Sequence, residues 1–175
     1  MRILLPILAV TVTLYSCSNN NPVTQPATPP STVDSNGLRN KKVALRILEG
    51  YGKRNLDSIQ RSEDFDKNFV DYGDGTTAPI KGIDSTKTAL KNWLEAFPDY
   101  AGSNFIAVSE NNYVMVYAEW NGTWKNPLNG KKPTGKAFKI NDVDIFKFNE
   151  EGKITEHRDI QPFLSTAMQI GMGMK

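Results

Sequence analysis

The sequence predicts an α+β domain in which helices pack on one face of a curved, largely antiparallel sheet. Amphipathic helical segments fill the first half of the region after residue 36, strand-like segments follow, and short turn sequences separate those strands. Consecutive strands joined by short turns pair as antiparallel neighbours. Helices that precede such a set of strands cover one of its faces.

The first predicted helix follows Gly37. Its apolar residues recur with the spacing of one helix face, and Gly50 or Gly52 ends it; the set is Leu38, Leu45, Leu48 and Tyr51. Asn55 can cap a short second helix. Residues 69–72 (FVDY) then form a short strand that ends at a GDG turn.

A third helix begins at Asp84 or Ser85 and ends before Pro98. Its apolar residues are spaced i, i+3, i+4 and i+7, at Leu90, Trp93, Leu94 and Phe97. Segments rich in β-branched and aromatic residues follow at 104–109, 113–124, 136–148 and 153–161. Pro162 suits the first position of a last short helix that ends near Gly171.

The charge distribution argues against a nucleic-acid partner. The formal net charge is +2, with 21 basic and 19 acidic residues dispersed along the chain. One histidine and no cysteine within the domain offer too few ligands for a transition-metal site. Glycine-rich nucleotide motifs are absent from the sequence, so neither a metal nor another cofactor is expected.

Residues 1–16 have the composition of a secretory signal peptide. Arg2 precedes a short apolar run, and the chain's single cysteine, Cys17, follows Leu14-Tyr15-Ser16. This segment resembles the signal of a bacterial lipoprotein, although Tyr15 is bulkier than the usual residue at its position. The resemblance implies a lipid anchor on Cys17 in the bacterial envelope, and Ser18 favours the outer membrane, facing the periplasm. An ordinary signal peptide with a chance cysteine is the alternative.

Residues 17–35 lack the apolar residues needed for a core and are rich in proline, so they form a tether between that anchor and the domain. Residues 36–175 are sufficient for one domain with a core.

Four short motifs in this domain occur in the order found in one family: ALKNWLEAFPDY, KKPTGKAFKINDVDIFKF, EEGKITEHRDIQ and STAMQIG. Residues 38–171 thereby resemble the SnoaL-like polyketide-cyclase-type domains of the nuclear-transport-factor-2-like superfamily. The resemblance implies a cone-shaped sheet with three to four helices on its concave face. It also implies a homodimer formed through the outer face of the sheet. Members include cyclases, isomerases, hydrolases and proteins without catalysis, so fold does not fix function.

The resemblance also implies a site residue. In the cyclases and in related limonene epoxide hydrolases the last strand carries a catalytic carboxylate, and HRDI places Asp159 at that position. The hydrolases add an arginine and a second carboxylate from an earlier strand. The comparable segment here offers Tyr117 and Glu119 but no arginine, which argues against epoxide hydrolysis.

Strand alternation places Thr155, His157, Asp159 and Gln161 on one face. Such a polar face is more typical of solvent, whereas the resemblance places Asp159 inside the cone. Side chains two apart on a strand are about 6.5–7 Å apart, too far for a close hydrogen bond. We therefore expect Asp159 to act as a base, with His157 as an acid or an orienting group, on two atoms of one substrate rather than as a preassembled pair.

Candidate ligand-binding residues are Tyr72, Trp93, Phe97, Tyr117, Trp120 and Asp144. For the aromatic residues among them, packing in the core is the more typical role, and Asp144 serves equally well as a surface charge. Two functions stay open for a domain that binds a small, largely apolar organic molecule. One is a cyclase- or isomerase-type enzyme, and the other is a non-catalytic binding or interaction module.

Overall fold

One mixed sheet forms the frame of the domain. A computed structural model describes residues 34–160 and 163–173, and within them the strands are β1 (Phe65–Asp71), β2 (Ile80–Lys81), β3 (Ala101–Glu110), β4 (Tyr113–Thr123), β5 (Ala137–Phe148) and β6 (Ile154–Asp159). They pair in the order β2-β1-β6-β5-β4-β3. The β1–β6 pairing is parallel and the other pairings in this sheet are antiparallel.

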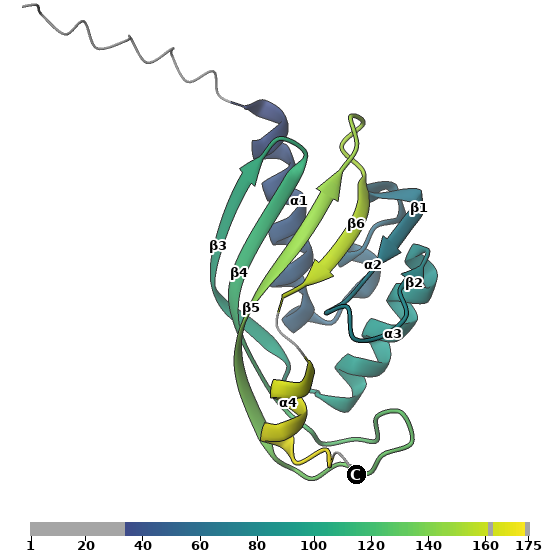
Figure 1. Ribbon diagram of the computed structural model, residues 1–175, viewed down its shortest axis with the longest axis vertical. Coiled ribbons are helices and arrows are strands. Elements are labelled where there is room, and N and C mark those ends of the chain that lie inside the picture. Colours follow the sequence, from purple (N-terminus) through teal and green to yellow (C-terminus); the bar gives the residue numbers. More distant parts are fainter. Residues whose placement is uncertain (1–33, 161–162, 174–175) are drawn as a thin grey trace, which may run out of the picture. The chain divides into compact units, whose positions relative to one another are not determined.

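Helices cover one face of this curved sheet (Figure 1). They are α1 (Ser35–Gly50), α2 (Leu56–Ile59), α3 (Ile83–Ala96) and α4 (Phe163–Ile170). Helix α1 packs against β3 and β4, α3 against β1, and α4 against β5. The predicted α+β class and its helices are confirmed. Strand β2 was not predicted, because its two residues are too few to show a period.

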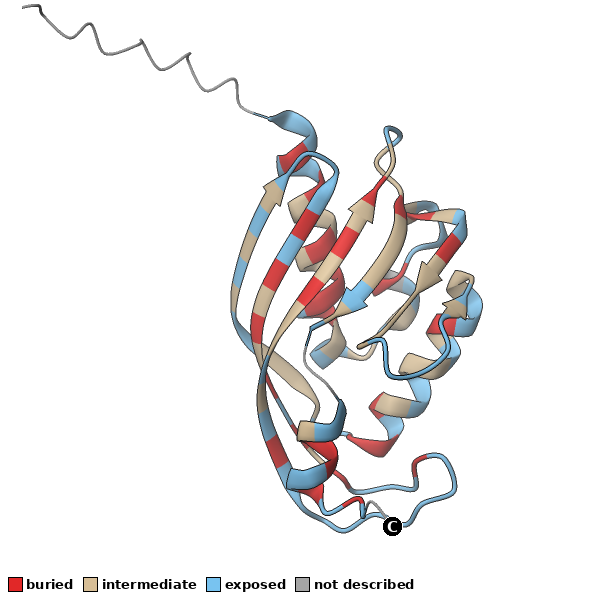
Figure 2. Cartoon of the chain, viewed as in Figure 1, coloured by how far each residue is buried: buried red, intermediate tan, exposed pale blue. Residues whose placement is uncertain are grey.

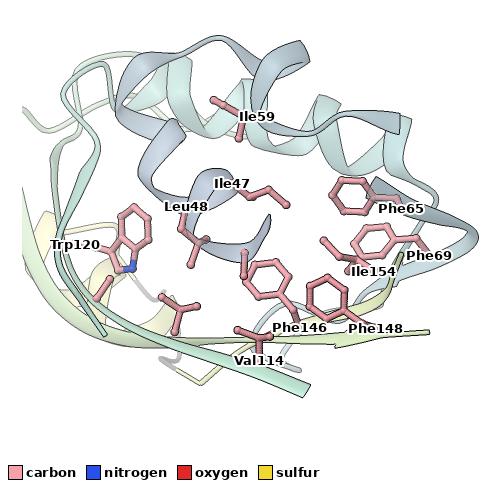
Figure 3. Packing of buried hydrophobic residues seen from close by; sticks show 13 residues of the cluster. Ile47, Leu48, Ile59, Phe65, Phe69, Val114, Trp120, Phe146, Phe148 and Ile154 are labelled. Carbon is pink, nitrogen blue, oxygen red and sulfur yellow. The ribbon is translucent and has the colours of Figure 1, made fainter. Parts of the chain in front are cut away.

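The core lies between this face and the helices. Along β4, buried residues alternate with more accessible ones, so Val114, Val116, Ala118 and Trp120 point inward (Figure 2). Ile47 and Leu48 of α1 lie over Val114, Phe146 and Phe148 of the sheet (Figure 3). A second cluster surrounds Phe97, Trp124 and Phe138 and includes Ile170 of α4.

The pairing of β6 contains an irregularity that the predicted alternation missed. Phe148 pairs with Ile154, but Lys147 pairs with Glu156, so Thr155 is an extra residue between them. The Thr155 hydroxyl donates to the carbonyl of Lys147 over 3.2 Å. As a result Ile154 and His157, three residues apart, both lie on the helix-covered face. The strict alternation predicted along this strand is therefore interrupted at Thr155, because a period of two cannot register a bulge.

The predicted signal peptide and Cys17 lie outside the described residues, as does the tether up to residue 33. Helix α1 begins at Ser35, so the last tether residue is helical. In the part of the chain that the structure describes, none of the helices has the length and apolar character to cross a bilayer. The outer face of β3 and β4 exposes Ile106, Val108 and Met115. A homodimer through that face stays a prediction.

Candidate functional site

A cavity of about 540 Å³ opens between the sheet and the helices. Aromatic side chains supply much of its wall, including Phe69, Trp93, Tyr100, Phe146 and Phe163. Its acidic and imidazole side chains come from β1, the turn after β1, β5 and β6, and they are Asp71, Asp74, Asp142, Asp144, His157 and Asp159. Apolar walls with a few grouped polar side chains are typical of small-molecule sites.

Sheet register brings the polar residues together. His157 is opposite Asp71 in the parallel β1–β6 pair, and Asp159 is opposite Asp144 in the antiparallel β5–β6 pair. Opposite residues on neighbouring strands share a face and lie close enough for their side chains to interact. Residues far apart in sequence thus form one cluster.

His157 is the centre of this cluster. Its Nδ1 lies 3.0 Å from Asp71 Oδ1, and its Nε2 lies 3.2 Å from Asp144 Oδ1. Asp159 Oδ1 is 3.5 Å from the same Nε2. The ring also packs against Phe146, with 4.8 Å between ring centroids. The preassembled pairs therefore join His157 to Asp71 and Asp144, whereas Asp159 makes a longer contact.

These carboxylates keep His157 protonated. Burial lowers the pKa of the His157 imidazole, but the charge of Asp159 and the hydrogen bonds to Asp144 and Asp71 outweigh burial and raise it well above 6.5. Burial raises the pKa of Asp71, but the His157 bond and charge reverse that effect, so the Asp71 pKa is lowered from 3.8. An imidazolium donates from both nitrogens, which fits its two carboxylate partners.

Asp159 is the carboxyl group poised to change protonation near neutral pH. Burial and, to a smaller extent, the charges of Asp144, Asp142 and Asp71 raise its pKa from 3.8 to about 7, against the attraction of His157. Burial also raises the pKa of Asp144. About a third of the Asp159 side chain remains accessible, at 34%, so a molecule in the cavity can reach its oxygens.

Two tyrosine hydroxyl groups add donors to the cavity. Tyr51 and Tyr100 line it, and burial, followed by the charge of Asp144, raises the pKa of both well above 10.0. Both hydroxyl groups therefore keep their protons at neutral pH and can donate hydrogen bonds.

The structure brings some of the predicted site residues together and separates others. His157, Asp159, Asp144 and Trp93 line the cavity. Phe97 and Trp120 are buried in the two core clusters and do not line it.

Tyr72 and Tyr117 lie away from the cavity. The Tyr72 ring stacks on the guanidinium of Arg158, whose Cζ is 3.8 Å from the ring centroid. Tyr117 lies on the outward-facing side of β4. The outward direction of Tyr117 could be predicted from the alternation along β4, because the residues on either side of it, Val116 and Ala118, are apolar and face inward.

Sequence reasoning missed Asp71, Asp142 and Tyr51 as parts of the cavity. Asp71 stands in a predicted strand, but that strand's parallel pairing with β6 could not be inferred from short turns. Asp142 is two residues before Asp144 on β5 and therefore shares its face.

The single histidine of the domain does not by itself exclude a metal site, because carboxylates also bind metal ions. Atoms of Asp144, His157 and Asp159 lie within 4.8 Å of one another, so these three side chains could hold an ion. Both ring nitrogens of His157, however, already face carboxylate oxygens at hydrogen-bond distance.

Known proteins resemble this chain in family and in fold. The SnoaL-like polyketide cyclase family model matches residues 41–170. No curated protein matches the chain significantly. A SnoaL-like protein of known structure from Jannaschia sp. CCS1 is 20% identical, with a TM-score of 0.71, and the match covers 80% of this chain and 96% of that chain.

Two further solved structures share the fold. A phenazine biosynthesis-related protein from Pseudomonas aeruginosa is 18% identical with a TM-score of 0.65, covering 85% of this chain and 92% of that chain. A protein with a ketosteroid isomerase-like fold from Catenulispora acidiphila, in complex with trimethylamine, is 13% identical with a TM-score of 0.61. That match covers 74% of this chain and 92% of that chain.

Proposed function

Since the chain belongs to the SnoaL-like polyketide cyclase family, we propose that it is an acid–base enzyme acting on a small, largely apolar organic molecule in its cavity. The observation that carries this proposal is the placement of Asp159, whose pKa is about 7, at the wall of an aromatic cavity. A general base works best when its pKa lies near the working pH. A cyclase- or isomerase-type reaction begins with such a base.

In this proposal Asp159 takes a proton from a carbon next to a carbonyl group. The electron pair of the broken C–H bond moves onto the carbonyl oxygen, which becomes an enolate. The Tyr51 and Tyr100 hydroxyl groups are available as donors to that oxygen, because both line the cavity and keep their protons. Asp159 can then return its proton to another carbon of the enolate. Alternatively, the enolate carbon attacks a second carbonyl carbon of the same molecule, which closes a ring, and the new alkoxide oxygen takes the proton from Asp159.

His157 has an orienting and electrostatic role here rather than that of a free acid. Its nitrogens are engaged by Asp71 and Asp144. Its positive charge lies 3.5 Å from Asp159 Oδ1 and stabilises the ionised carboxylate. A neutral histidine would leave Asp159 a weaker acid and would reduce the fraction of base present at neutral pH.

The base can be tested without the natural substrate, with 5-nitrobenzisoxazole as a carbon acid. A base removes the proton on the ring carbon, the N–O bond breaks, and a coloured cyanonitrophenolate forms. We expect the catalysed rate to rise with pH and to reach half its maximum near pH 7, the pKa of Asp159. A rate no greater than that given by the same concentration of acetate would favour the non-catalytic binding module instead.

We also propose that lipid on Cys17 holds the domain at the bacterial envelope, with residues 18–34 as the spacer. The support is the short apolar run up to Leu14, which is followed within three residues by the chain's only cysteine. We expect the parent protein to pellet with membranes and Cys17→Ala to move to the soluble fraction, because the variant loses the acylated side chain. A substitution of the neighbouring Ser18→Ala is the control. Equal membrane fractions for parent and Cys17→Ala would contradict the anchor.

A further inference from the structure

The cavity contains an excess of negative charge that proton transfer does not require. Its lining includes five aspartates and one histidine, and no lysine or arginine is among the lining residues that the structure describes. His157 is shared between Asp71 and Asp144. Beside an apolar wall such carboxylates interact with a ligand's charge more strongly than they would in water.

Two buried oxygen atoms at this cavity lack a hydrogen-bond donor. In the described part of the chain, Asp144 Oδ2 and Gln60 Oε1 are buried side-chain atoms without a partner. Asp144 is 5% exposed and Gln60 is 4% exposed, and both residues line the cavity. Unsatisfied polar groups in native interiors are rare and call for an explanation. Both atoms are acceptors in residues of the cavity wall, so a rotation of either side chain would present an unpaired acceptor to a donor of the ligand.

The rest of the wall suits an organic group with a positive charge. Trp93, Phe97 and Tyr100 form one group of contacting rings, and Trp93 also meets Phe163 with 6.1 Å between centroids. Of these, Trp93, Tyr100 and Phe163 line the cavity. Aromatic faces attract cations, and this attraction grows when the cation leaves water.

We propose that the cavity binds an organic ammonium ion, a protonated amine on an apolar body, whose N–H groups donate to the carboxylates around Asp144. The proposal rests on the proposed function, because it names the substrate class for the same cavity. The apolar body would lie against the aromatic wall, and the ammonium group would be held by Asp144 and Asp159. A carbon–hydrogen bond near the ammonium group would then be within reach of the proposed base.

An organic cation fits these observations better than a metal ion does. A metal bound by Asp144, Asp159 and His157 would need the Nε2 lone pair of His157, whereas that imidazole is protonated and donates from both nitrogens. A single ion would also leave most of the 540 Å³ and its aromatic wall without a role. Metal binding therefore serves as an outcome that would overturn the proposal.

Because Asp159 changes its protonation near neutral pH, the affinity for an ammonium ion should depend on pH. The groups that face Asp159 are His157, Asp144, Asp142 and Asp71, and the Asp159 pKa is about 7. Above that pH the cavity gains a negative charge, so an ammonium ion should bind more tightly at pH 8 than at pH 6. A neutral ligand of the same shape should not show this rise.

The decisive experiment compares three ligands that share a phenyl group and differ in charge. Isothermal titration calorimetry of the intact protein at pH 8 would measure phenethylammonium, neutral 2-phenylethanol and anionic phenylacetate. We expect phenethylammonium to bind at least about tenfold more tightly than 2-phenylethanol, as one charge-assisted hydrogen bond provides. Phenylacetate should bind most weakly. Equal affinity for the ammonium and the alcohol would overturn the proposal.

Two variants and a control test which carboxylates are responsible. Asp144→Asn and Asp159→Asn should each lose most of the preference for the ammonium ion. Glu150→Gln, an exposed position in the turn after β5, makes the same change in net charge outside the cavity and should retain it. Should a variant fail to fold, the ligand series on the parent still decides the question. A last titration adds Zn²⁺ or Mn²⁺ alone to the protein. Metal binding that excludes phenethylammonium would also overturn the proposal.

Failure of this inference can be distinguished from failure of the proposed function. The carbon-acid assay uses a neutral probe and measures proton removal, whereas calorimetry measures binding without turnover. Suppose the protein opens the ring of 5-nitrobenzisoxazole but binds phenethylammonium no better than 2-phenylethanol. The proposed base would then be supported, and the proposed ammonium ligand would be wrong. If the protein binds phenethylammonium preferentially but does not open the ring, the ammonium ligand would be supported and the proposed base would be wrong.

Discussion

His157→Gln is expected to lower the free energy of unfolding by about 3 kcal/mol at neutral pH, as loss of one partner from a buried ion pair does. Glutamine keeps an amide donor but has no charge. Asp71 and Asp144, whose Oδ1 atoms lie 3.0 and 3.2 Å from the His157 ring nitrogens, would then be buried without a counter-charge. Urea unfolding of parent and variant at several pH values measures the difference.

The effect of His157→Gln should depend on pH in a defined way. In the parent, the raised His157 pKa gives stability that is fully present below 6.5 and is lost as pH rises through the folded value. The lowered Asp71 pKa gives stability that is present above 3.8 and is lost as pH falls through the folded value. In the variant the unpaired carboxyl groups can take up protons in acid, so the gap should be small near pH 4 and grow toward pH 6.5.

Glu156→Gln is the matched control for this prediction. Glu156 is next to His157 in sequence but on the outer face, where its carboxylate lies 2.7 Å from Lys147 Nζ. Ion pairs that remain in contact with solvent contribute little, so Glu156→Gln should change stability far less than His157→Gln. Equal losses in the two variants would show that the cluster around His157 is no more important to the fold than a surface ion pair.

Local patterns predicted most of this fold because each helix and long strand carries its own period. The run from Leu90 to Phe97 specifies one face of α3, and alternation along β4 specifies its inward side. The parallel pairing of β1 with β6 has no such local signal. It joins Asp71 to His157, residues 86 positions apart, and is fixed only by the arrangement of the whole sheet.

The candidate site was predicted in part for the same reason. Asp159 and Trp93 could be proposed from the family motif and from aromatic content. The role of His157 could not, because its partners come from β1 and β5 rather than from its own strand. The bulge at Thr155 is a further limit, since an extra residue shifts the alternation without leaving a mark in residue type.

Asp159→Asn should remove the base and nearly abolish proton removal from carbon. We expect the rate of 5-nitrobenzisoxazole ring opening to fall by about 10²–10⁴-fold, the usual contribution of a positioned general base. The amide has the shape of the carboxyl group but cannot accept the proton. Asp57→Asn, an exposed position 97% accessible in its side chain, is the control and should keep the parent rate.

The same variant should become more stable than the parent as pH rises toward neutrality. The folded pKa of Asp159, about 7, lies above its usual value of 3.8, so the native protein holds this proton more tightly than the unfolded chain does. The parent therefore loses stability as pH rises from 3.8 to about 7, and Asp159→Asn does not. Part of the gain is offset because His157 loses the attraction of one carboxylate. In thermal melts the two proteins should have the same melting temperature near pH 4, and the melting temperature of Asp159→Asn should exceed that of the parent increasingly up to pH 7. Melting curves that superimpose over this range would show that Asp159 is an ordinary solvated carboxylate and not a base with a raised pKa.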